Sequence, residues 1–476
     1  MKSAQNSIKD LKQKRKPELW EAFVPIIGMA VLLGGGYGVL QYPVEILLIC
    51  ASIIAGGMAL RLGYTWKDIE SGIIDSIAKA MPAQMIIIVV GVMIASWIAC
   101  GSIPMLIDYG LGIVSPSLFL VTACVVCGII SLLTGTAYGT AGTVGIAFIG
   151  IAQGMGIPLA PAAGAIVAGA YLGDKISPFA ASVNLASAAV RCNVIDTIQH
   201  LLWTTLPAYV IGLIIYWIAG SQFAIHSVST EKIVLIQNTL RSTFTYHWLL
   251  LLPPLIVLVL TFMRKPAIPG MLLSAAIALI LAYYLQGKPF VKGMEYCVSG
   301  YEASTNMPEV NLLLSRGGLQ EMMKISLLAF CAFAFAGIVQ KAGMLDLLLE
   351  KILHYAKTTA LLIASGVAAA LMTALVTGSA YLSVLIPGEL FAPAFKAKNL
   401  AAKNLARATQ EAHSIVPVVP WAIAGVYMTG TLGVSTWDYA PWAVFNYIGF
   451  LFPVLYGAIG FKTAPLKNDD ESIAGS

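Results

Sequence analysis

The sequence predicts an all-α polytopic membrane protein that is built from two repeats. Of its 476 residues, 58% are hydrophobic and only 11% are charged, whereas a soluble domain carries roughly 25% charged residues. Lipid offers the backbone no hydrogen-bond partners, and the alternating pattern of barrel strands is absent, so long apolar stretches are predicted to be helices. The stretches that approach the ~20 residues needed to cross a bilayer are 22 to 40, 83 to 100, 201 to 219, 269 to 285, 325 to 340, 359 to 376 and 441 to 461.

A recurring motif indicates the internal repeat. Leu-Thr-Gly-Thr-Ala-Tyr at Leu133–Tyr138 returns as Val-Thr-Gly-Ser-Ala-Tyr at Val376–Tyr381, 243 residues later. Downstream, an acidic residue and then a proline precede the next apolar helix in both halves. The predicted organisation is a basic N-terminus (1–20), a first transmembrane repeat (21–220), a connector (221–247), a second transmembrane repeat (248–462) and a polar tail (463–476). Residues 62 to 80, which mix charged residues with isoleucines, are predicted to form an interfacial helix.

The distribution of charge predicts the orientation and excludes several functions. Basic residues precede the first span, so the positive-inside rule predicts a multi-pass protein of the plasma membrane with a cytoplasmic N-terminus. These residues are Lys2, Lys9, Lys12, Lys14, Arg15 and Lys16. The basic residues do not form one face of the kind that binds nucleic acid. No protease, esterase or ATP-pump motif occurs, so neither an enzyme nor a cofactor is predicted, and coupling to an ion gradient remains.

The two repeated motifs place hydroxyls and glycines inside apolar runs. An unwound turn at membrane depth is tolerated only where it is buried in protein or lines a cavity, and matching breaks in two halves point to the binding site of a transporter. The alternative is that small residues let helices pack closely. The candidate binding residues in these motifs are Thr134, Thr136, Thr140, Thr377 and Ser379.

An acidic and a basic residue lie between two apolar stretches in the segment Gly173–Pro178. Ionisable groups at membrane depth are costly and usually functional. Asp174 is predicted to bind a cation or to exchange a proton, and Lys175 to neutralise Asp174 when the site is empty. Asn184 offers an amide oxygen of the kind that a hard cation accepts, so Asp174 and Asn184 are the candidate metal ligands. The alternative is an ion pair at a helix end in the interface.

Glu411 and His413 in the second half are candidate proton carriers, because a carboxylate and an imidazole can both titrate near neutrality. A cytoplasmic loop is the alternative, since basic residues lie just upstream. These basic residues are Lys396, Lys398, Lys403 and Arg407.

At these motifs the sequence resembles the NhaC-type sodium/proton antiporter family. The likeness extends from about residue 20 to 462 and rests on the segments Thr134–Thr143, Gly173–Pro178 with Asn184-Leu185, Leu405–Arg407 and Pro420-Trp421. The resemblance implies sodium/proton exchange, with some members transporting organic anions or amino acids. It also implies two inverted repeats with re-entrant hairpins or broken helices.

The chain departs from the family pattern on both sides of the candidate site. Where family members continue Ser-Pro-Leu-Ser-Asp/Glu-Thr-Thr-Asn, this chain reads Ser-Pro-Phe-Ala-Ala-Ser-Val-Asn over Ser177–Asn184, which removes one acid and two hydroxyls. In the second half the usual Leu-Glu-Asp-Ser-Gly-Thr is replaced by the segment Ala408–His413.

These observations lead to the hypothesis of a secondary active transporter, by resemblance a sodium/proton antiporter. Asp174 is its main ion-binding carboxylate, and the candidate oxygen ligands are Thr136, Ser177, Asn184 and Ser379. The alternative within transport is an ion-coupled exchanger or symporter of an organic acid or amino acid. A channel or a membrane-embedded enzyme is the third hypothesis. The expected partners are the lipid bilayer and a small ion or organic solute, with a homodimer left open.

Overall fold

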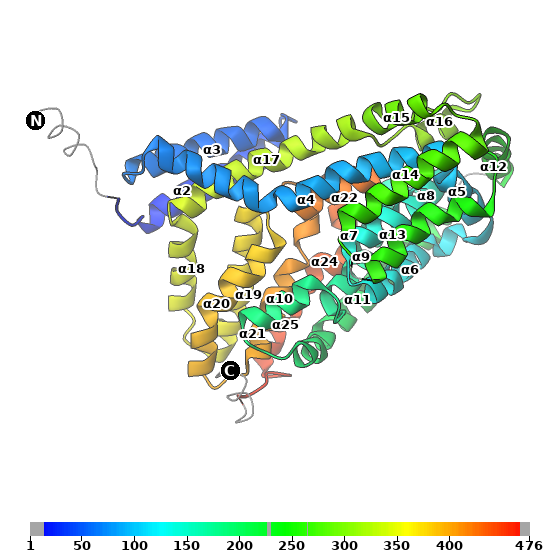
Figure 1. Cartoon of the computed structure of the whole chain (residues 1–476). Helices are drawn as coiled ribbons and strands as arrows, with labels where there is room; N and C mark the ends of the chain where they lie inside the picture. Colours follow the sequence, from blue (N-terminus) through cyan, green and yellow to red (C-terminus); the bar gives the residue numbers. More distant parts are fainter. Residues whose placement is uncertain (1–13, 226–229, 264, 467–476) are drawn as a thin grey trace, which may run out of the picture.

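The computed structural model describes residues 14–225, 230–263 and 265–466, and within them it confirms the predicted all-α polytopic fold (Figure 1). Over these ranges, the only strand-like pairing is an isolated bridge between Leu400 and Pro465. Eight described helices are long and apolar enough to cross a membrane, or up to eleven if each of three sharply bent pairs forms one span. Lys2, Lys9 and Lys12 and most of the predicted tail lie outside the described residues.

The first part of the chain, up to residue 225, is a continuous series of helices separated by short breaks. They are α2 (Leu19–Val31), the π-helix η1 (Leu32–Tyr37), α3 (Val44–Arg61), α4 (Trp66–Cys100), α5 (Ser102–Ile113), η2 (Pro116–Leu118), α6 (Phe119–Thr134), α7 (Ala137–Thr140), the π-helix η3 (Ala141–Gly145), α8 (Ile146–Gly154), α9 (Leu159–Ile176), α10 (Ala181–Ala189) and α11 (Val194–Ile225).

The remainder of the chain continues in the same manner. Its helices are α12 (Thr230–Thr243), η4 (Trp248–Leu251), α13 (Leu252–Phe262), α14 (Ala267–Gln286), α15 (Phe290–Ser299), α16 (Pro308–Leu314), α17 (Leu319–Lys341), α18 (Met344–His354), α19 (Thr359–Thr377), α20 (Ala380–Ala397), α21 (Ala402–His413), η5 (Val416–Val418), α22 (Ile423–Leu432), α23 (Thr436–Tyr439), η6 (Ala440–Trp442), α24 (Val444–Ile448) and α25 (Leu451–Ile459).

The order of helices repeats between the two parts. The long helix α4 ends at Gly101 with φ 95°, and its counterpart α17 is followed by Gly343 with φ 67°. Glycine adopts these left-handed angles without a steric penalty, so each long helix stops and the chain turns into a short helix, α5 or α18. The breaks after α6 and α19 follow at Gly135 and Gly378, which also have positive φ.

The equivalent long helices α4 and α17 run antiparallel to each other. Gly72 near the start of α4 packs on Gly337 near the end of α17, whereas Gly91 packs on Gly318 just before α17 begins. Each half also has a helical hairpin, α2–α3 in the first and α13–α14 in the second, that packs on the long helix of the other half. Helix α3 packs on α17, and α14 packs on α4. The short helices α5 and α18 lie at opposite ends of the molecule (Figure 1). This is the arrangement that inverted repeats require.

One segment differs from the sequence-based description. Residues 62 to 80 do not form a separate interfacial helix, because most of them are the first half of the continuous 35-residue helix α4. Small residues explain the difference, since Gly72 lets this half of α4 pack on α17. The predicted connector contains the helix α12, whose Arg241 Nε donates to the Asp108 carboxylate of α5 at 2.8 Å.

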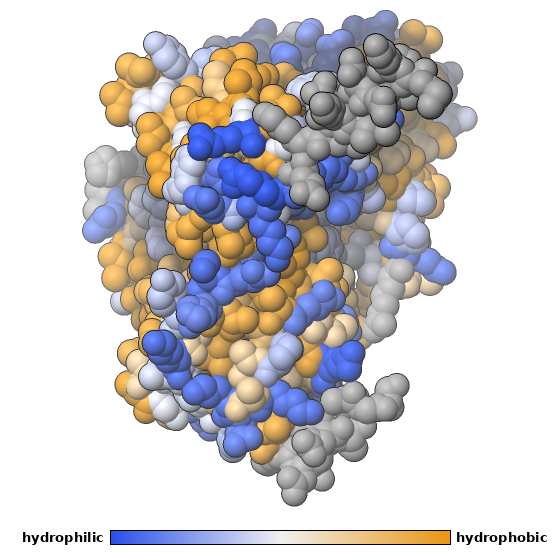
Figure 2. Space-filling model, turned by 90° about the vertical axis from the view of Figure 1, so that its left-hand side faces the viewer, coloured by the Kyte–Doolittle hydropathy of each residue, from blue (hydrophilic) through white to orange (hydrophobic). Residues whose placement is uncertain are grey.

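The end of the molecule that carries α18 has a mixed surface. Figure 2 shows hydrophilic side chains spread across this face, with hydrophobic side chains between and around them. Helix α18 itself buries Met344, Leu345, Leu348 and Leu349, while Asp346, Glu350 and Lys351 lie elsewhere on the same helix. This pattern is typical of a helix at the boundary between protein, lipid headgroups and water.

Candidate functional site

The broken helices line a cavity of about 420 Å³. Its walls come from the break between α6 and α7, the end of α9, the starts of α10, α20 and α22, and the α13–α14 hairpin. The lining includes polar, ionisable and aromatic side chains, namely Thr134, Thr136, Tyr138, Tyr171, Asp174, Phe179, Tyr381 and His413. Both halves therefore contribute to one cavity among the helix breaks, which is partly open where the exposed residues Lys265, Pro266 and Ala267 line it.

The break between α6 and α7 depends on a glycine and a threonine. Gly135 has φ 70°, and a Cβ at this position would lie 2.6 Å from the backbone carbon of Phe179. The next residue, Thr136, begins α7 by accepting a hydrogen bond from the Gly139 N–H at 3.3 Å. Glycine is thus required both for the left-handed turn and for the close approach of the α9–α10 loop.

The second half repeats this construction. Gly378 has φ 60°, and a Cβ there would lie 3.2 Å from the Cα of Ala422. Ser379 begins α20 by accepting from the Leu382 N–H at 3.3 Å, and the Ile423 N–H donates to the Gly378 carbonyl at 3.1 Å. The two predicted breaks are therefore present, and each one packs against the corresponding loop of its own half.

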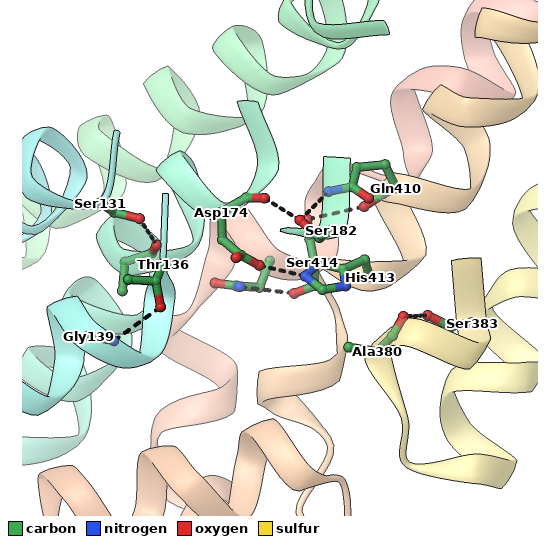
Figure 3. Close-up of polar contacts among 12 residues, drawn as sticks. Ser131, Thr136, Gly139, Asp174, Ser182, Ala380, Ser383, Gln410, His413 and Ser414 are labelled. Atoms are coloured by element: carbon green, nitrogen blue, oxygen red, sulfur yellow. Dashed lines mark hydrogen bonds and ion pairs between the residues drawn. The ribbon is translucent and has the colours of Figure 1, made fainter. Parts of the chain in front are cut away.

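Asp174 and His413 form the polar centre of the cavity wall (Figure 3). The His413 Nε2 lies 2.6 Å from the Asp174 Oδ2, and the two side chains are 5% and 17% exposed. Each residue stands four positions before a proline, Pro178 or Pro417, and the pair joins the two halves. The Tyr171 ring lies 6.0 Å from the imidazole. A carboxylate and an imidazole in contact can share or release a proton.

Lys175 contacts Glu411, and this pairing corrects the expectation that Lys175 neutralises Asp174. The Lys175 Nζ and the Glu411 Oε2 form an ion pair whose side chains are both 0% exposed. The ammonium also lies 5.1 Å from the Phe445 ring, and Gly449 packs so closely on the pair that a Cβ would collide with the Glu411 carboxylate. Because Lys175 is completely buried, the interpretation as an interfacial ion pair is wrong for this residue.

A third polar link joins the halves beside these pairs. The Ser182 hydroxyl donates to the Asp174 backbone carbonyl and accepts from the Gln410 Nε2 at 3.0 Å (Figure 3). These donor roles orient the Gln410 amide, since its nitrogen must face Ser182. Ser182 and Gln410 were not candidates, although both lie inside the segments where the chain departs from the family pattern.

The remaining candidates make local contacts. Ser177 donates to the Leu132 carbonyl at 2.8 Å, which ties the α9–α10 loop to α6. Asn184 is exposed, donates to the carbonyls of Pro178 and Ala180, and does not line the cavity. The structure therefore does not bring Asn184 together with Asp174.

The other hydroxyl candidates bond to their own helices. Thr134 donates to Ile130 and Thr140 to Thr136, both at 2.9 Å. Thr377 donates to the Thr373 carbonyl at 2.6 Å. Of the five motif hydroxyls, only those of Thr134 and Thr136 belong to residues that line the cavity.

The segment from Arg407 to Ser414 is buried, so the alternative of a cytoplasmic loop is wrong. It forms the end of α21 and its cap. Within the described chain, several of its polar atoms are buried without a hydrogen-bond partner, among them Glu411 Oε1, His413 Nδ1 and Gln410 Oε1. No cluster of three or more His, Cys, Asp or Glu side chains suited to a metal ion occurs among the described residues.

Comparison with known proteins places the chain among transporters. The family model described as "Na+/H+ antiporter family" matches residues 169–461, a range that contains both ionisable pairs. An uncharacterized Na+/H+ antiporter of Haemophilus influenzae is 41% identical over 97% of this chain and 100% of its own length.

Two further relatives cover nearly the whole chain. The Na+/H+ antiporter NhaC of Alkalihalophilus pseudofirmus is 35% identical over 91% of this chain and 93% of its own. A malate-2H+/Na+-lactate antiporter of Bacillus subtilis is 32% identical over 94% of this chain and 96% of its own. The relatives thus include exchangers of inorganic ions and of organic acids.

Proposed function

The chain belongs to the Na+/H+ antiporter family, and from this premise we propose that it exchanges sodium ions for protons at the Asp174–His413 pair. It is a multi-pass secondary active transporter. The observation that carries the proposal is the 2.6 Å contact between a carboxylate of one half and an imidazole of the other in the wall of a cavity that both halves line.

Competition for the Asp174 carboxylate explains how one site couples the two ions. With a proton on His413, the imidazolium neutralises Asp174 and the two side chains stay in contact. A sodium ion at Asp174 supplies the same positive charge, so the imidazolium is repelled and releases its proton. Since the pair bridges the two halves, ion exchange also makes and breaks a contact between them. Thr134 and Thr136 on the same wall offer oxygens to the sodium ion.

The buried Lys175–Glu411 pair lies beside the Asp174–His413 pair, and its two opposite charges stay neutralised by each other while the ions exchange. Its two side chains have 0% exposure, and separating buried charges from their partners is costly. We assign it the role of holding α9 against α21, so that Asp174 and His413 stay in register while their own contact changes.

Flux measurements on purified protein in sealed vesicles test this assignment. We expect Asp174→Asn and His413→Gln to reduce sodium-driven proton flux to background, because each keeps the shape of its side chain but removes a titratable group. Asn184→Ala is the matched control, since Asn184 lies outside the cavity, and it should retain flux. Near-normal exchange by a stably folded Asp174→Asn variant would contradict the assignment.

A second candidate function is exchange of a small organic acid coupled to sodium and protons. The cavity has about 420 Å³, which lies within the range of small-molecule pockets, and its walls carry aromatic rings. These are Tyr138, Tyr171, Phe179 and Tyr381. The malate-2H+/Na+-lactate antiporter among the relatives supports this candidate. Counterflow of labelled malate or lactate in the same vesicles, with sodium alone as the comparison, distinguishes the two functions.

We also propose a cytoplasmic N-terminus. Lys14, Lys16 and Arg15 precede α2, and the Arg15 N–H donates to the Leu62 carbonyl at 3.2 Å, so the start of α2 and the end of α3 lie on the same side. Protection of an N-terminal tag from protease in whole cells tests the orientation. A homodimer stays a prediction, which the mass of the detergent-solubilised protein decides.

A further inference from the structure

A separate cavity lies between the start of α11, helix α21 and the segment 460–466 that follows α25. Its volume is about 320 Å³, and it shares no lining residue with the central cavity. The lining residues that determine its charge and its polarity are Asp196, Trp203, Lys403, Lys462 and Thr463. The cavity therefore lies outside the site proposed for ion exchange.

A completely buried guanidinium stands directly behind the wall of this cavity. Arg407 has 0% exposure, and its Nη1 donates to the carbonyl of the lining residue Lys462 at 3.2 Å. In the described chain its Nε and Nη2 have no hydrogen-bond partner, and the same is true of the buried hydroxyl oxygen of Thr463. Buried polar atoms are normally paired, so these atoms point to a ligand that offers hydrogen-bond acceptors.

The buried charges beside the cavity do not balance. Glu411 lies one turn from Arg407 on α21 and acts on it electrostatically, but its carboxylate is already paired with Lys175. These three buried residues therefore carry two positive charges and one negative charge. A buried charge without a counter-charge is costly, so an anion next to the guanidinium would stabilise this part of the protein.

Lys462 in the cavity wall has an unusual backbone conformation. Its φ is 49°, in the left-handed region that a lysine rarely adopts. The bond from Arg407 fixes its carbonyl, and its ammonium lies 3.9 Å from the centre of the Trp203 ring. Together with Lys403, it gives the lining two ammonium groups against the one carboxylate of Asp196. The charge of the lining therefore also favours an anion.

The surface of α11 changes from polar to apolar at this cavity. Residues on one face of the helix, at helical spacing, are Asp196, Gln199, Trp203, Leu206 and Val210, and all except the half-buried Asp196 are exposed. Helix α11 is long and apolar enough to cross the membrane, so its exposed apolar side chains face lipid. The polar start of the same face then lies at the level of the lipid headgroups.

Aromatic side chains mark the same level on the neighbouring helix. The Tyr456 hydroxyl of α25 donates to the Trp203 carbonyl at 3.1 Å, and the Phe461 ring meets the Trp203 ring edge-on at 6.1 Å. Leu455 and Ile459 of α25 are exposed beside them. Tryptophan and tyrosine are enriched where the membrane meets water, so the cationic cavity adjoins an apolar surface at the membrane boundary.

From this geometry we propose that the cavity binds the phosphate group of an anionic phospholipid. The phosphate oxygens accept from the ammonium groups of Lys403 and Lys462, and the guanidinium of Arg407 adds its charge from behind the wall. The acyl chains cover the exposed apolar side chains of α11 and α25. Free phosphate would satisfy the cations alone, whereas a lipid also covers the apolar surface, and this favours the lipid as the ligand.

Native mass spectrometry of the purified full-length protein in detergent tests the site. Phosphatidylglycerol, phosphatidylcholine or inorganic phosphate is titrated, and the bound fraction gives an apparent Kd for each. We expect phosphatidylglycerol to bind more tightly than phosphatidylcholine. Lys403→Gln and Lys462→Gln should each weaken phosphatidylglycerol binding about fivefold, since a lysine near an anionic lipid surface contributes roughly that much. Asp196→Asn removes the opposing carboxylate, so it should tighten binding.

Another lysine near the cavity supplies the control. Lys396 lines a neighbouring cavity that Lys403 also lines, but it does not line the proposed lipid site, so Lys396→Gln should leave the Kd unchanged. Lys403→Arg and Lys462→Arg keep the charge and should retain binding. Melting temperatures measured without added lipid show whether each variant is folded. Asp196→Asn, which is expected to strengthen binding, cannot be mimicked by loss of the fold.

Three results would overturn the proposal. The first is an equal Kd for the anionic and the zwitterionic lipid, and the second is unchanged phosphatidylglycerol binding in the double variant Lys403→Gln with Lys462→Gln. The third is binding of inorganic phosphate that depends on the same two lysines, without retention of phosphatidylglycerol, which would assign the cavity to free phosphate. Since none of these measurements requires ion flux, they are independent of the Asp174–His413 assignment.

Discussion

At the scale of residues, two adjacent ionisable residues, Asp174 and Lys175, contact different partners. Asp174 contacts His413, whereas Lys175 contacts Glu411. Successive residues of an α-helix point about 100° apart, so the carboxylate and the ammonium on α9 contact different residues of α21. Their adjacency suggested an ion pair between them, yet the helix geometry separates them and each finds its partner in the other half. The sequence identified all four ionisable residues but not the pairing, because pairing depends on how α9 packs on α21.

Removal of one member of the Lys175–Glu411 pair should destabilise the protein strongly. Lys175→Met leaves the Glu411 carboxylate buried without a counter-charge, and such changes cost about 3–5 kcal/mol. The double variant Lys175→Met with Glu411→Leu removes both charges, so it should recover most of that stability. Thermal unfolding in detergent measures both effects. Equal melting temperatures for the single variant and the parent would show that the pair does not stabilise the fold.

At the scale of elements, the helix breaks followed from local chemistry. A glycine and then a threonine or serine inside an apolar run predict a helix end and a new helix start, and Gly135-Thr136 and Gly378-Ser379 behave in this way. The continuity of α4 through residues 66–80 was not predictable from its charge pattern. It depends on Gly72, which lets α4 pack on α17, and the packing partner is more than 240 residues distant in the sequence.

The two break glycines should differ in their tolerance of alanine. Gly135→Ala adds a Cβ that lies 2.6 Å from backbone of the α9–α10 loop, whereas at Gly378 the nearest atom is at 3.2 Å. Both variants also carry the left-handed strain of about 1–2 kcal/mol. We therefore expect Gly135→Ala to lower the melting temperature more than Gly378→Ala.

Gly460→Ala serves as the reference for that comparison. Gly460 has φ 71°, and an added Cβ meets nothing within 4 Å, so its melting temperature reports the left-handed strain alone. If Gly135→Ala were no more destabilising than Gly460→Ala, the close approach of the loop would not be important for the fold.

At the scale of the whole molecule, the repeat was readable but its inversion was not. The recurrence at an offset of 243 residues identified equivalent segments, because both halves need the same break at the same place. A sequence repeat does not show whether its two copies are parallel or antiparallel in the structure, so the inverted arrangement was implied only by the family resemblance. The antiparallel packing of α4 on α17 and the exchange of the α2–α3 and α13–α14 hairpins between halves supply that direction.

The Arg316 guanidinium departs from this symmetry, and its removal should weaken the end of α22. It donates to the Leu432 carbonyl at the end of α22 at 2.7 Å, where a positive charge favours the helix C-terminus. The position 243 residues earlier holds Ile73, so the first half has no equivalent guanidinium. Arg316→Gln keeps a donor but removes the charge, and Arg316→Met removes both. We expect the melting temperature in detergent to fall in the order parent, Arg316→Gln, Arg316→Met, whereas the matched control Ile73→Met should change it little. An unchanged melting temperature for Arg316→Met would show that the guanidinium does not stabilise this helix end.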